Sequence, residues 1–359
     1  MTTRTGWDRC PGLLRPHIAD DGAVVRLRIP GGHVRVSVLL ELLAVGTDAG
    51  APFLQLTSRG NLQLRALPDP LPDALMTRIE ATGLLPSASH ERVRNILASP
   101  LAADLASIVQ ELDEAICADA ALVELPGRFL FAVADPSGSV LSEPYDIAYQ
   151  STSDSHGVLL SGGRGIAVDR AKAVGAMLDR ARLFLAYRPS ERCWNVRDLP
   201  AGSRVLEGLE PVSTRLAPPL APGIVGPDLV AGVPLGLLTR AHVEALAQVV
   251  DTVVVTPWRS VVVNGGAASA PPLQEAGLVV RANTPWARLS ACIGAPSCSK
   301  SATPTLHIAH QLTSLLPAAG PRIHLSGCDR LCGHPAQDYL SVVGATDPTD
   351  AMTQIGATP

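Results

Sequence analysis

Alternating apolar and polar positions predict short β-strands in the first part of the chain. The segment 23–29 (AVVRLRI) alternates apolar and charged residues, as expected of a strand with one buried face. The apolar stretch 36–45 (VSVLLELLAV) that follows is typical of a buried helix. Two more strands are expected at 53–57 and 62–67, joined by a turn at 59–61 (RGN).

The same order of elements recurs in the second half of the chain. We expect a strand at 233–238 (VPLGLL), a helix at 239–250, and strands at 253–259 and 260–265. The alternative is that two α+β segments share this pattern by chance. The common order and turn chemistry favour an internal duplication.

Two short phrases follow each copy and support the duplication. IEATGLL at 79–85 resembles LQEAGLVV at 273–280. RVRNILASP at 92–100 then corresponds in position to RLSACIGAP at 288–296. The chain is therefore predicted to contain two related halves.

The boundaries of these halves follow from composition. A Pro- and Gly-rich segment indicates a linker, and the Ala-, Leu- and Arg-rich segment 170–187 is predicted to form a helix that closes the first half. The expected division is a first half-domain at 1–75, a first lobe at 76–198, the linker at 199–227, a second half-domain at 228–270 and a second lobe at 271–359.

Composition excludes several classes of function. With 359 residues, 47% hydrophobic residues and 17% charged residues, the chain can bury more than one core. A net charge of −4 and 3% aromatic residues argue against nucleic-acid binding. The first residues lack the apolar core of a signal peptide, and the stretch 36–45 is too short to span a membrane. We expect a soluble cytoplasmic protein without nucleic-acid or membrane partners.

Four cysteines in the last quarter of the chain suggest a metal centre. Cys292 and Cys298 form a C-x5-C pair, and Cys328 and Cys332 form a C-x3-C pair. Structural zinc sites usually space their cysteines more closely, whereas loops that hold an iron–sulfur cluster provide four thiolates. An iron–sulfur cluster is therefore favoured over zinc, over disulfides and over four unrelated thiols. The remaining cysteines are expected to be ordinary thiols: Cys10, Cys117 and Cys193.

No redox cofactor domain is evident elsewhere. Gly163-x-Gly165 lacks the third glycine of a dinucleotide fingerprint, so a tight turn is the better interpretation. His307 and His310 lie three residues apart on an expected helix and are predicted to face solvent. Electrons would have to come from a separate ferredoxin or NADH-dependent reductase.

The cysteine motifs resemble those of the sirohaem sulfite and nitrite reductase family. That resemblance implies that the four cysteines hold a [4Fe–4S] cluster and that the last, Cys332, also bridges to the sirohaem iron. LQLTSRGNLQL resembles the family's T-x-R-Q-N-x-Q motif, with Gly60 in place of the usual Gln. VRNILASP and LPGRFLFAVAD resemble two further family segments. The implied fold is a duplicated α+β nitrite/sulfite reductase fold, with two ferredoxin-like half-domains and two α/β lobes, the second binding the cluster.

The same motifs imply residues that bind a tetrapyrrole. Carboxylates around such a macrocycle need guanidinium groups, which bind them bidentately and stay charged when desolvated. The motif positions are Arg59, Asn61, Gln63, Arg94, Asn95 and Arg128. Arg65 and Arg92 are expected to be solvated surface charges. No catalytic residue is assigned.

One branch of the family, the precorrin-3B synthases, resembles the chain more closely. The reductases carry two lysines where this chain has Arg128 and Leu130, and an apolar Leu130 cannot stabilise a small oxyanion. The opening CPGLLRPHIADDGAVVRLRIPGG and both cysteine motifs resemble the synthase branch. The resemblance implies a monooxygenase of aerobic cobalamin (vitamin B12) biosynthesis. It would use dioxygen to hydroxylate precorrin-3A at carbon 20 and would form a γ-lactone.

Two other functions remain open. The first is a sirohaem-dependent sulfite or nitrite reductase, and the second is a non-catalytic Fe–S electron-transfer or sensor protein. The synthase resemblance also implies a mononuclear non-haem iron. His324 and His334 are its nearest candidate ligands, although a structural role is favoured for each histidine.

Overall fold

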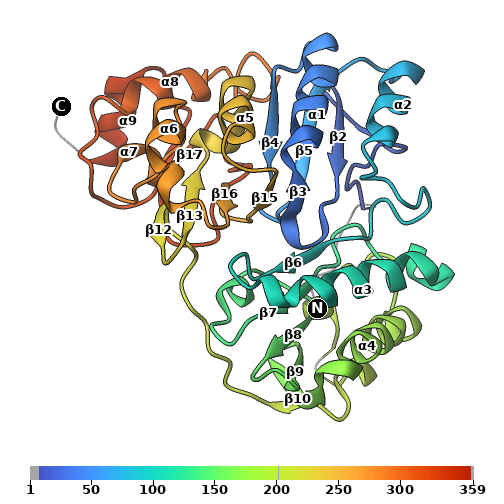
Figure 1. The fold of residues 1–359 in the computed structure, drawn as a ribbon. Helices are drawn as coiled ribbons and strands as arrows, with labels where there is room; N and C mark the ends of the chain where they lie inside the picture. The colour runs from blue at the N-terminus through green and yellow to red at the C-terminus, as the bar shows by residue number, and fades with distance from the viewer. Residues whose placement is uncertain (1–7, 201, 357–359) are drawn as a thin grey trace.

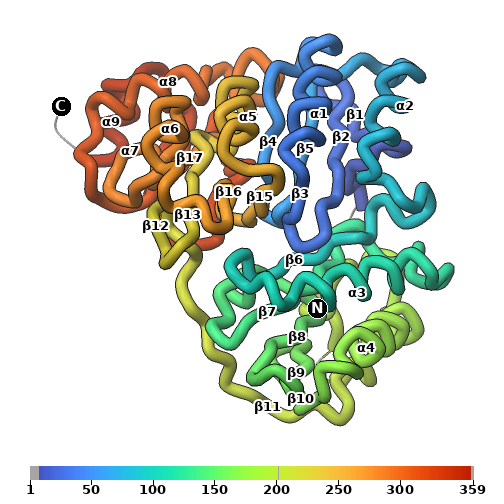
Figure 2. Tube along the Cα trace, viewed as in Figure 1, coloured from blue at the N-terminus to red at the C-terminus, as the bar shows by residue number. Residues whose placement is uncertain are grey.

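The computed structural model describes residues 8–200 and 202–356. Their strands form four sheets, two of five strands, one of six and one of three. The two five-stranded sheets and their helices lie side by side, and the six-stranded sheet lies beneath them in the view of Figures 1 and 2. The expectation about a leader peptide concerns residues 1–7, which lie outside the described residues.

The first sheet contains strands from both halves of the chain. In spatial order its strands are β1 (His17–Ala19), β2 (Gly22–Leu27), β5 (Leu62–Leu67), β4 (Phe53–Leu56) and β14 (Leu237–Thr239). All neighbours are antiparallel, and Leu238 of β14 pairs with Leu54 of β4.

The second sheet repeats this arrangement with the halves exchanged. Its strands are β12 (Gly223–Val225), β13 (Asp228–Gly232), β16 (Ser260–Val263), β15 (Thr252–Val255) and β3 (His33–Arg35). Val34 of β3 pairs with Val253 of β15. Each sheet therefore receives its last strand from the other half, and the matching strand order supports the expected duplication.

Helices of both halves share one core. α1 (Val36–Asp48) packs against α5 (Arg240–Ala247), and the apolar faces of both sheets join the same buried cluster. The helices α2 (Asp73–Ala81) and α6 (Ala270–Glu275) end before Gly83 and Gly277. Both glycines have positive φ, at 78° and 99°, which favours glycine after a helix. The similar segments IEATGLL (79–85) and LQEAGLVV (273–280) therefore mark the ends of equivalent helices.

The expected strand at 233–238 is wrong in part. Residues Pro234–Gly236 form a 3-10 turn, and only β14 (Leu237–Thr239) is extended. The physical reason is local, because proline lacks a backbone donor and Gly236 takes a φ of 72°. The strand equivalent to the expected strand 23–29 is β13, just before this segment.

The first lobe is built on the six-stranded sheet. Its order is β11 (Glu210–Pro211), β10 (Arg164–Asp169), β9 (His156–Ser161), β8 (Ile147–Ser151), β7 (Phe131–Ala134) and β6 (Ile96–Ala98). The strands β6, β7 and β8 run parallel. Two helices cover it, α3 (Ala106–Ala118) and α4 (Ala173–Tyr187), and α4 is the helix expected at 170–187.

The second lobe repeats the parallel part of the first. Its sheet has the parallel strands β17 (Leu289–Ala291), β18 (Ile323–Ser326) and β19 (Leu340–Val343). Its helices are α7 (Pro285–Arg288), α8 (Thr305–Leu312) and α9 (Pro348–Ile355). A separate apolar cluster forms its core.

The expected linker at 199–227 is not devoid of structure. It contains β11 and β12, and between them an extended segment is held to the first lobe because the Ala217 N–H donates to the Ser137 carbonyl at 2.9 Å. Gly163 lies in the β9–β10 turn, as expected of a tight turn.

Helix length and hydropathy together decide whether a segment can span a membrane. Within the described ranges, no helix is long and apolar enough to cross a membrane.

Candidate functional site: an arginine-lined cavity beside the cysteine loops

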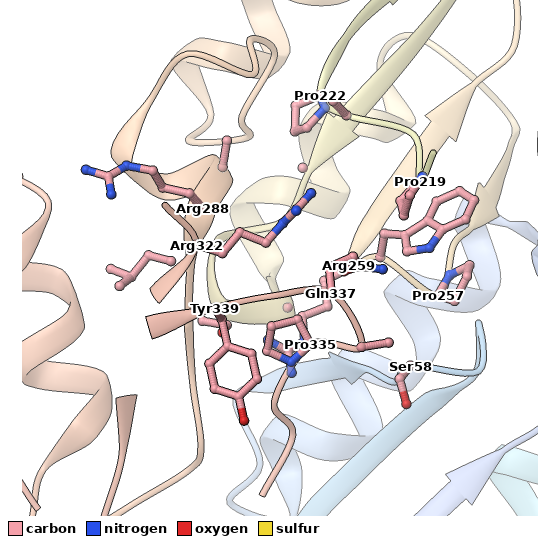
Figure 3. A pocket seen from close by; sticks show the side chains of 18 of the residues that line it. Ser58, Pro219, Pro222, Pro257, Arg259, Arg288, Arg322, Pro335, Gln337 and Tyr339 are labelled. Carbon is pink, nitrogen blue, oxygen red and sulfur yellow. The ribbon is translucent and has the colours of Figure 1, made fainter. Parts of the chain in front are cut away.

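A cavity of about 1170 Å³ lies where both half-domains, both lobes and the linker meet. The first half supplies Arg59 and Arg128, and the linker supplies residues 219–222. The second half supplies the turn 257–259 and the loops around β17, β18 and β19. Figure 3 shows Arg259, Arg288 and Arg322 with several of the prolines around this space.

The charge of the cavity is strongly positive. Five arginines line it, namely Arg59, Arg128, Arg259, Arg288 and Arg322. Among the described lining residues, Glu143 and Asp338 are the only acids. The rest of the wall is largely apolar and aromatic and includes Trp258 and Trp286. Such a cavity is suited to a flat apolar molecule that carries several anionic groups.

Two equivalent turns place arginines in the cavity. Arg59 lies between β4 and β5, and Arg259 lies between β15 and β16. Burial lowers the pKa of both guanidinium groups, although arginine stays protonated at neutral pH. The Arg59 side chain makes no hydrogen bond or ion pair with any described residue. Arg259 donates to the carbonyl oxygen of Gly333, next to Cys332.

Arg128 reaches the cavity from the loop before β7. Its guanidinium lies 5.2 Å from the centre of the Trp194 ring and 3.8 Å from the carboxylate of Asp8. Asp8 also accepts a hydrogen bond from the Gly127 N–H at 2.5 Å. The stacking leaves the side chain 47% exposed, so Arg128 is oriented but still accessible.

Arg94 does not line the cavity, which argues against the expected role in binding carboxylates. Its side chain is 5% exposed and forms a bidentate pair with Asp113, at 2.7 and 2.6 Å. The remaining Nη1 donates to the Leu84 carbonyl at 2.9 Å. The reason is that α3 brings Asp113 against Arg94 and satisfies its donors.

Asn61, Gln63 and Asn95 are also outside the cavity wall and hold the neighbouring turns. Asn61 is 1% exposed; its Oδ1 accepts from the Ile29 N–H at 3.0 Å and its Nδ2 donates to Asn95 at 3.2 Å. Asn95 in turn donates to the Gly127 carbonyl at 3.0 Å. Gln63 accepts from Arg26 at 2.9 Å. These amides position the Arg59 and Arg128 loops.

The sequence-predicted surface arginine Arg65 is paired instead. It makes two 2.8 Å hydrogen bonds with Asp21, and its side chain is 15% exposed. Cys10, which was expected to be an ordinary thiol, accepts hydrogen bonds at its sulfur. Arg28 and Arg26 donate to it at 3.2 and 3.4 Å.

The second lobe brings the four predicted cysteine ligands together. Cys292 follows β17 and Cys328 follows β18, and these parallel neighbours end at the same edge of the sheet. Cys298 and Cys332 lie in the loops that follow. The pKa of the Cys332 thiol is raised by burial and then by Cys292 and Cys328, with a smaller contribution from Cys298. All four are free thiols.

Four thiols are the donor set that a [4Fe–4S] cluster requires. In the described part of the chain, no three His, Cys, Asp or Glu side chains are close enough to share one metal ion. A [4Fe–4S] cluster binds each thiolate at a different iron and therefore needs four thiols around a larger space. The four cysteines satisfy this requirement in number and in kind.

The two candidate histidines lie beside the cysteine loops. His324 is fully buried, its Nδ1 lies 2.9 Å from the Ser290 hydroxyl, and burial lowers its pKa to about 4. Its Nε2 has no hydrogen bond of good geometry with a described residue, although the Cys332 backbone lies near enough to affect its pKa. His334 stacks on Tyr339 at 5.5 Å. The solvent-facing prediction for His307 and His310 is confirmed.

The sequence did not identify several charged residues of the cavity, namely Arg259, Arg288, Arg322, Glu143 and Asp338. The duplication offered a signal for Arg259, because its turn is equivalent to that of Arg59. Arg288 donates to the carbonyls of Pro321 and Pro317, at 2.9 and 2.6 Å, and Figure 3 shows its side chain extending away from that of Arg322. No local sequence pattern marks Arg288, at the end of α7, or Arg322, just before β18.

Comparisons with known proteins concern the whole chain and its fold. No family model matches the chain. A curated precorrin-3B synthase from a Sinorhizobium species is 28% identical over 94% of this chain and 80% of its own length. The solved structure of the Mycobacterium tuberculosis NirA protein superposes with a TM-score of 0.62, at 17% identity, over 92% of this chain and 73% of that one. The chain therefore shares the α+β fold of the NirA protein. Its resemblance to precorrin-3B synthase is confirmed.

Proposed function

We propose that this chain is a precorrin-3B synthase of aerobic cobalamin biosynthesis. It would hydroxylate precorrin-3A at carbon 20 with dioxygen and form the γ-lactone. The observation that carries the proposal is the arginine-lined cavity beside the four cysteines. The Sinorhizobium relative, named precorrin-3B synthase, supports the same substrate.

The cavity suits precorrin-3A in charge and in shape. Acetate and propionate carboxylates surround the apolar macrocycle, and guanidinium groups bind carboxylates strongly where water is excluded. Arg59 and Arg128 would hold carboxylates from the first half, while Arg259 and Arg322 would do so from the second. Trp258 and Trp286 would cover the ring.

Cys292, Cys298, Cys328 and Cys332 would hold a [4Fe–4S] cluster, which supplies single electrons when bound. The Arg259 contact to Gly333 links the cavity wall to the Cys332 loop. Electrons would come from a separate ferredoxin or NADH-dependent reductase. The described residues do not form a three-ligand site for a separate mononuclear iron, so we assign no step to one.

A specific residue disfavours the sirohaem reductase alternative. Leu130 lines the cavity and is 1% exposed, at a position where the resembled reductases carry a lysine. An apolar side chain there gives a small oxyanion no charge stabilisation. The non-catalytic alternative gives the Arg59 side chain, which lines the cavity and has no hydrogen bond or ion pair with a described residue, no role.

Conversion of precorrin-3A tests the proposal directly. Protein purified without air is incubated with precorrin-3A, a reductant and dioxygen, and products are analysed by mass spectrometry. We expect a product heavier by one oxygen atom. Cluster-loaded protein that leaves precorrin-3A unchanged but contains sirohaem and reduces sulfite would support the alternative instead.

A further inference from the structure

Glu143 is a buried acid in the wall of an otherwise basic cavity. It follows the 3-10 turn Ser139–Ser142 in the first lobe and is 5% exposed. The other acid in the described wall, Asp338, lies on an exposed loop of the second lobe. A buried carboxyl that faces a space for a polyanionic ligand needs a specific reason.

Among the described residues, one of the two carboxyl oxygens of Glu143 has a hydrogen-bond partner. Trp258 Nε1 donates to Oε1 at 2.9 Å across the boundary between the halves. No hydrogen bond joins Oε2 to a described residue. The backbone is held by the Glu143 N–H, which donates to Val140 at 3.2 Å, and by the Tyr145 N–H, which donates to the Glu143 carbonyl at 2.8 Å. The carboxyl is therefore fixed in place with one oxygen free.

The surroundings of this acid shift its pKa upward. Burial raises the pKa of Glu143, and the Trp258 hydrogen bond opposes that change in part. The charged groups that share the wall are the five arginines and Asp338, and none of them is among the causes of the shift. The nearest titratable neighbour on its own segment is Tyr145, whose pKa is also raised by burial.

We propose that Glu143 is the proton-transfer residue of the cavity, acting on the bound tetrapyrrole. The inference rests on the proposed function. Its O–H bond breaks as a nitrogen or carbon of the macrocycle accepts the proton, and no electrons are exchanged in this step. The carboxylate that remains keeps the Trp258 hydrogen bond and later regains a proton from solvent. An uncharged acid also avoids repulsion of the ligand carboxylates.

The competing explanation is that Glu143 only links the two halves through Trp258. Two substitutions separate these roles. In Glu143→Gln, the amide oxygen keeps the length and the acceptor for Trp258 but cannot transfer a proton. In Glu143→Asp, the side chain keeps the acid but is one methylene too short to preserve the 2.9 Å contact. A linking role predicts that Gln preserves function better than Asp, and a proton-transfer role predicts the reverse.

The experiment compares binding and turnover in the full cluster-loaded protein. Binding is measured with uroporphyrin, a stable polycarboxylate macrocycle, and turnover is measured with precorrin-3A, reductant and dioxygen. We expect Glu143→Gln to bind uroporphyrin like the wild type but to lose about 100-fold in turnover, the usual effect of removing an acid–base group. Glu143→Asp should retain more turnover than Glu143→Gln. The exposed Glu124→Gln variant should match the wild type in both measurements.

The outcomes decide between the two proposals. Turnover of Glu143→Gln close to the wild-type value, or above that of Glu143→Asp, would overturn the role of Glu143 while leaving the synthase proposal intact. A wild-type protein that neither binds uroporphyrin nor converts precorrin-3A would refute the proposed function itself. If the Gln variant does not fold, Glu143→Asp still decides, because a linking role requires it to lose turnover.

Discussion

The guanidinium of Arg59 lines the cavity and has no partner among the described residues, so it is available to a ligand. We predict that Arg59→Gln weakens uroporphyrin binding by about 10-fold or more, the usual effect of losing a charged hydrogen bond. Fluorescence titration measures the affinity. Arg65→Gln is the matched control, because Arg65 lies in the next strand and is paired with Asp21. Equal affinities for the two variants would contradict the account.

Replacing Arg94 should lower the stability of the protein, whereas replacing Arg59 should lower its affinity for the ligand. Breaking its buried pair with Asp113 leaves an uncompensated charge, and we predict that Arg94→Gln lowers the free energy of unfolding by about 3 kcal/mol. Urea denaturation measures this change. Uroporphyrin affinity should be unaffected in the folded variant. A large loss of affinity without a loss of stability would restore the carboxylate-binding role predicted from the motif.

Residues in local motifs were predicted better than residues in loops. Arg59 lies in a turn between two recognisable strands, so its position in the fold follows from the pattern. Arg94 lies in a motif of equal clarity, but its partner on α3 is fixed only by tertiary packing. Arg322 and Glu143 enter the cavity from loops whose paths no periodicity predicts.

The elements β3 and β14 join the two halves. Each has only three residues and adds to the sheet of the other half. The sequence predicted the longer strands and α1, because their apolar periodicity is strong. It did not predict the exchange, because three residues carry too little pattern and the pairing depends on the other half.

Because the two halves share one apolar core, a destabilising substitution in one half should also destabilise the other half. Leu43 is fully buried in α1 and belongs to the cluster that includes both sheets. Leu43→Ala should lower the free energy of unfolding by about 3 kcal/mol, as reported by Trp258 fluorescence in a chain whose other tryptophans are replaced by phenylalanine. Leu315→Ala, at a position that is 48% exposed, should have little effect. If the unfolding transition reported by Trp258 fluorescence is the same with and without Leu43→Ala, the halves unfold independently.

In the whole molecule, the two half-domains contribute in the same way to the cavity, but the two lobes differ. Both half-domains supply an arginine turn to the cavity, whereas only the second lobe carries the four predicted cluster cysteines. The sequence predicted the duplication and the four cysteines because their spacing is local. The enclosure of one cavity by all the parts is a property of the assembled fold.

The ligand assignment of the cluster predicts the effect of removing one thiol. Cys332→Ser should remove the brown absorbance of the protein and most of its iron and acid-labile sulfide, because the serine hydroxyl is a much poorer iron ligand. Cys117→Ser, outside the cluster loops, should retain the absorbance, iron and sulfide. Iron and sulfide contents that are unchanged in Cys332→Ser would refute the assignment.

In the proposed function, the cavity holds a tetrapyrrole as the substrate of an oxygenation. Incubation of the cluster-loaded protein with precorrin-3A, a reductant and dioxygen labelled with heavy oxygen tests it most directly. We expect the mass spectrum of the product to show one labelled oxygen atom from dioxygen. A product whose added oxygen is unlabelled, or precorrin-3A recovered without change, would contradict it.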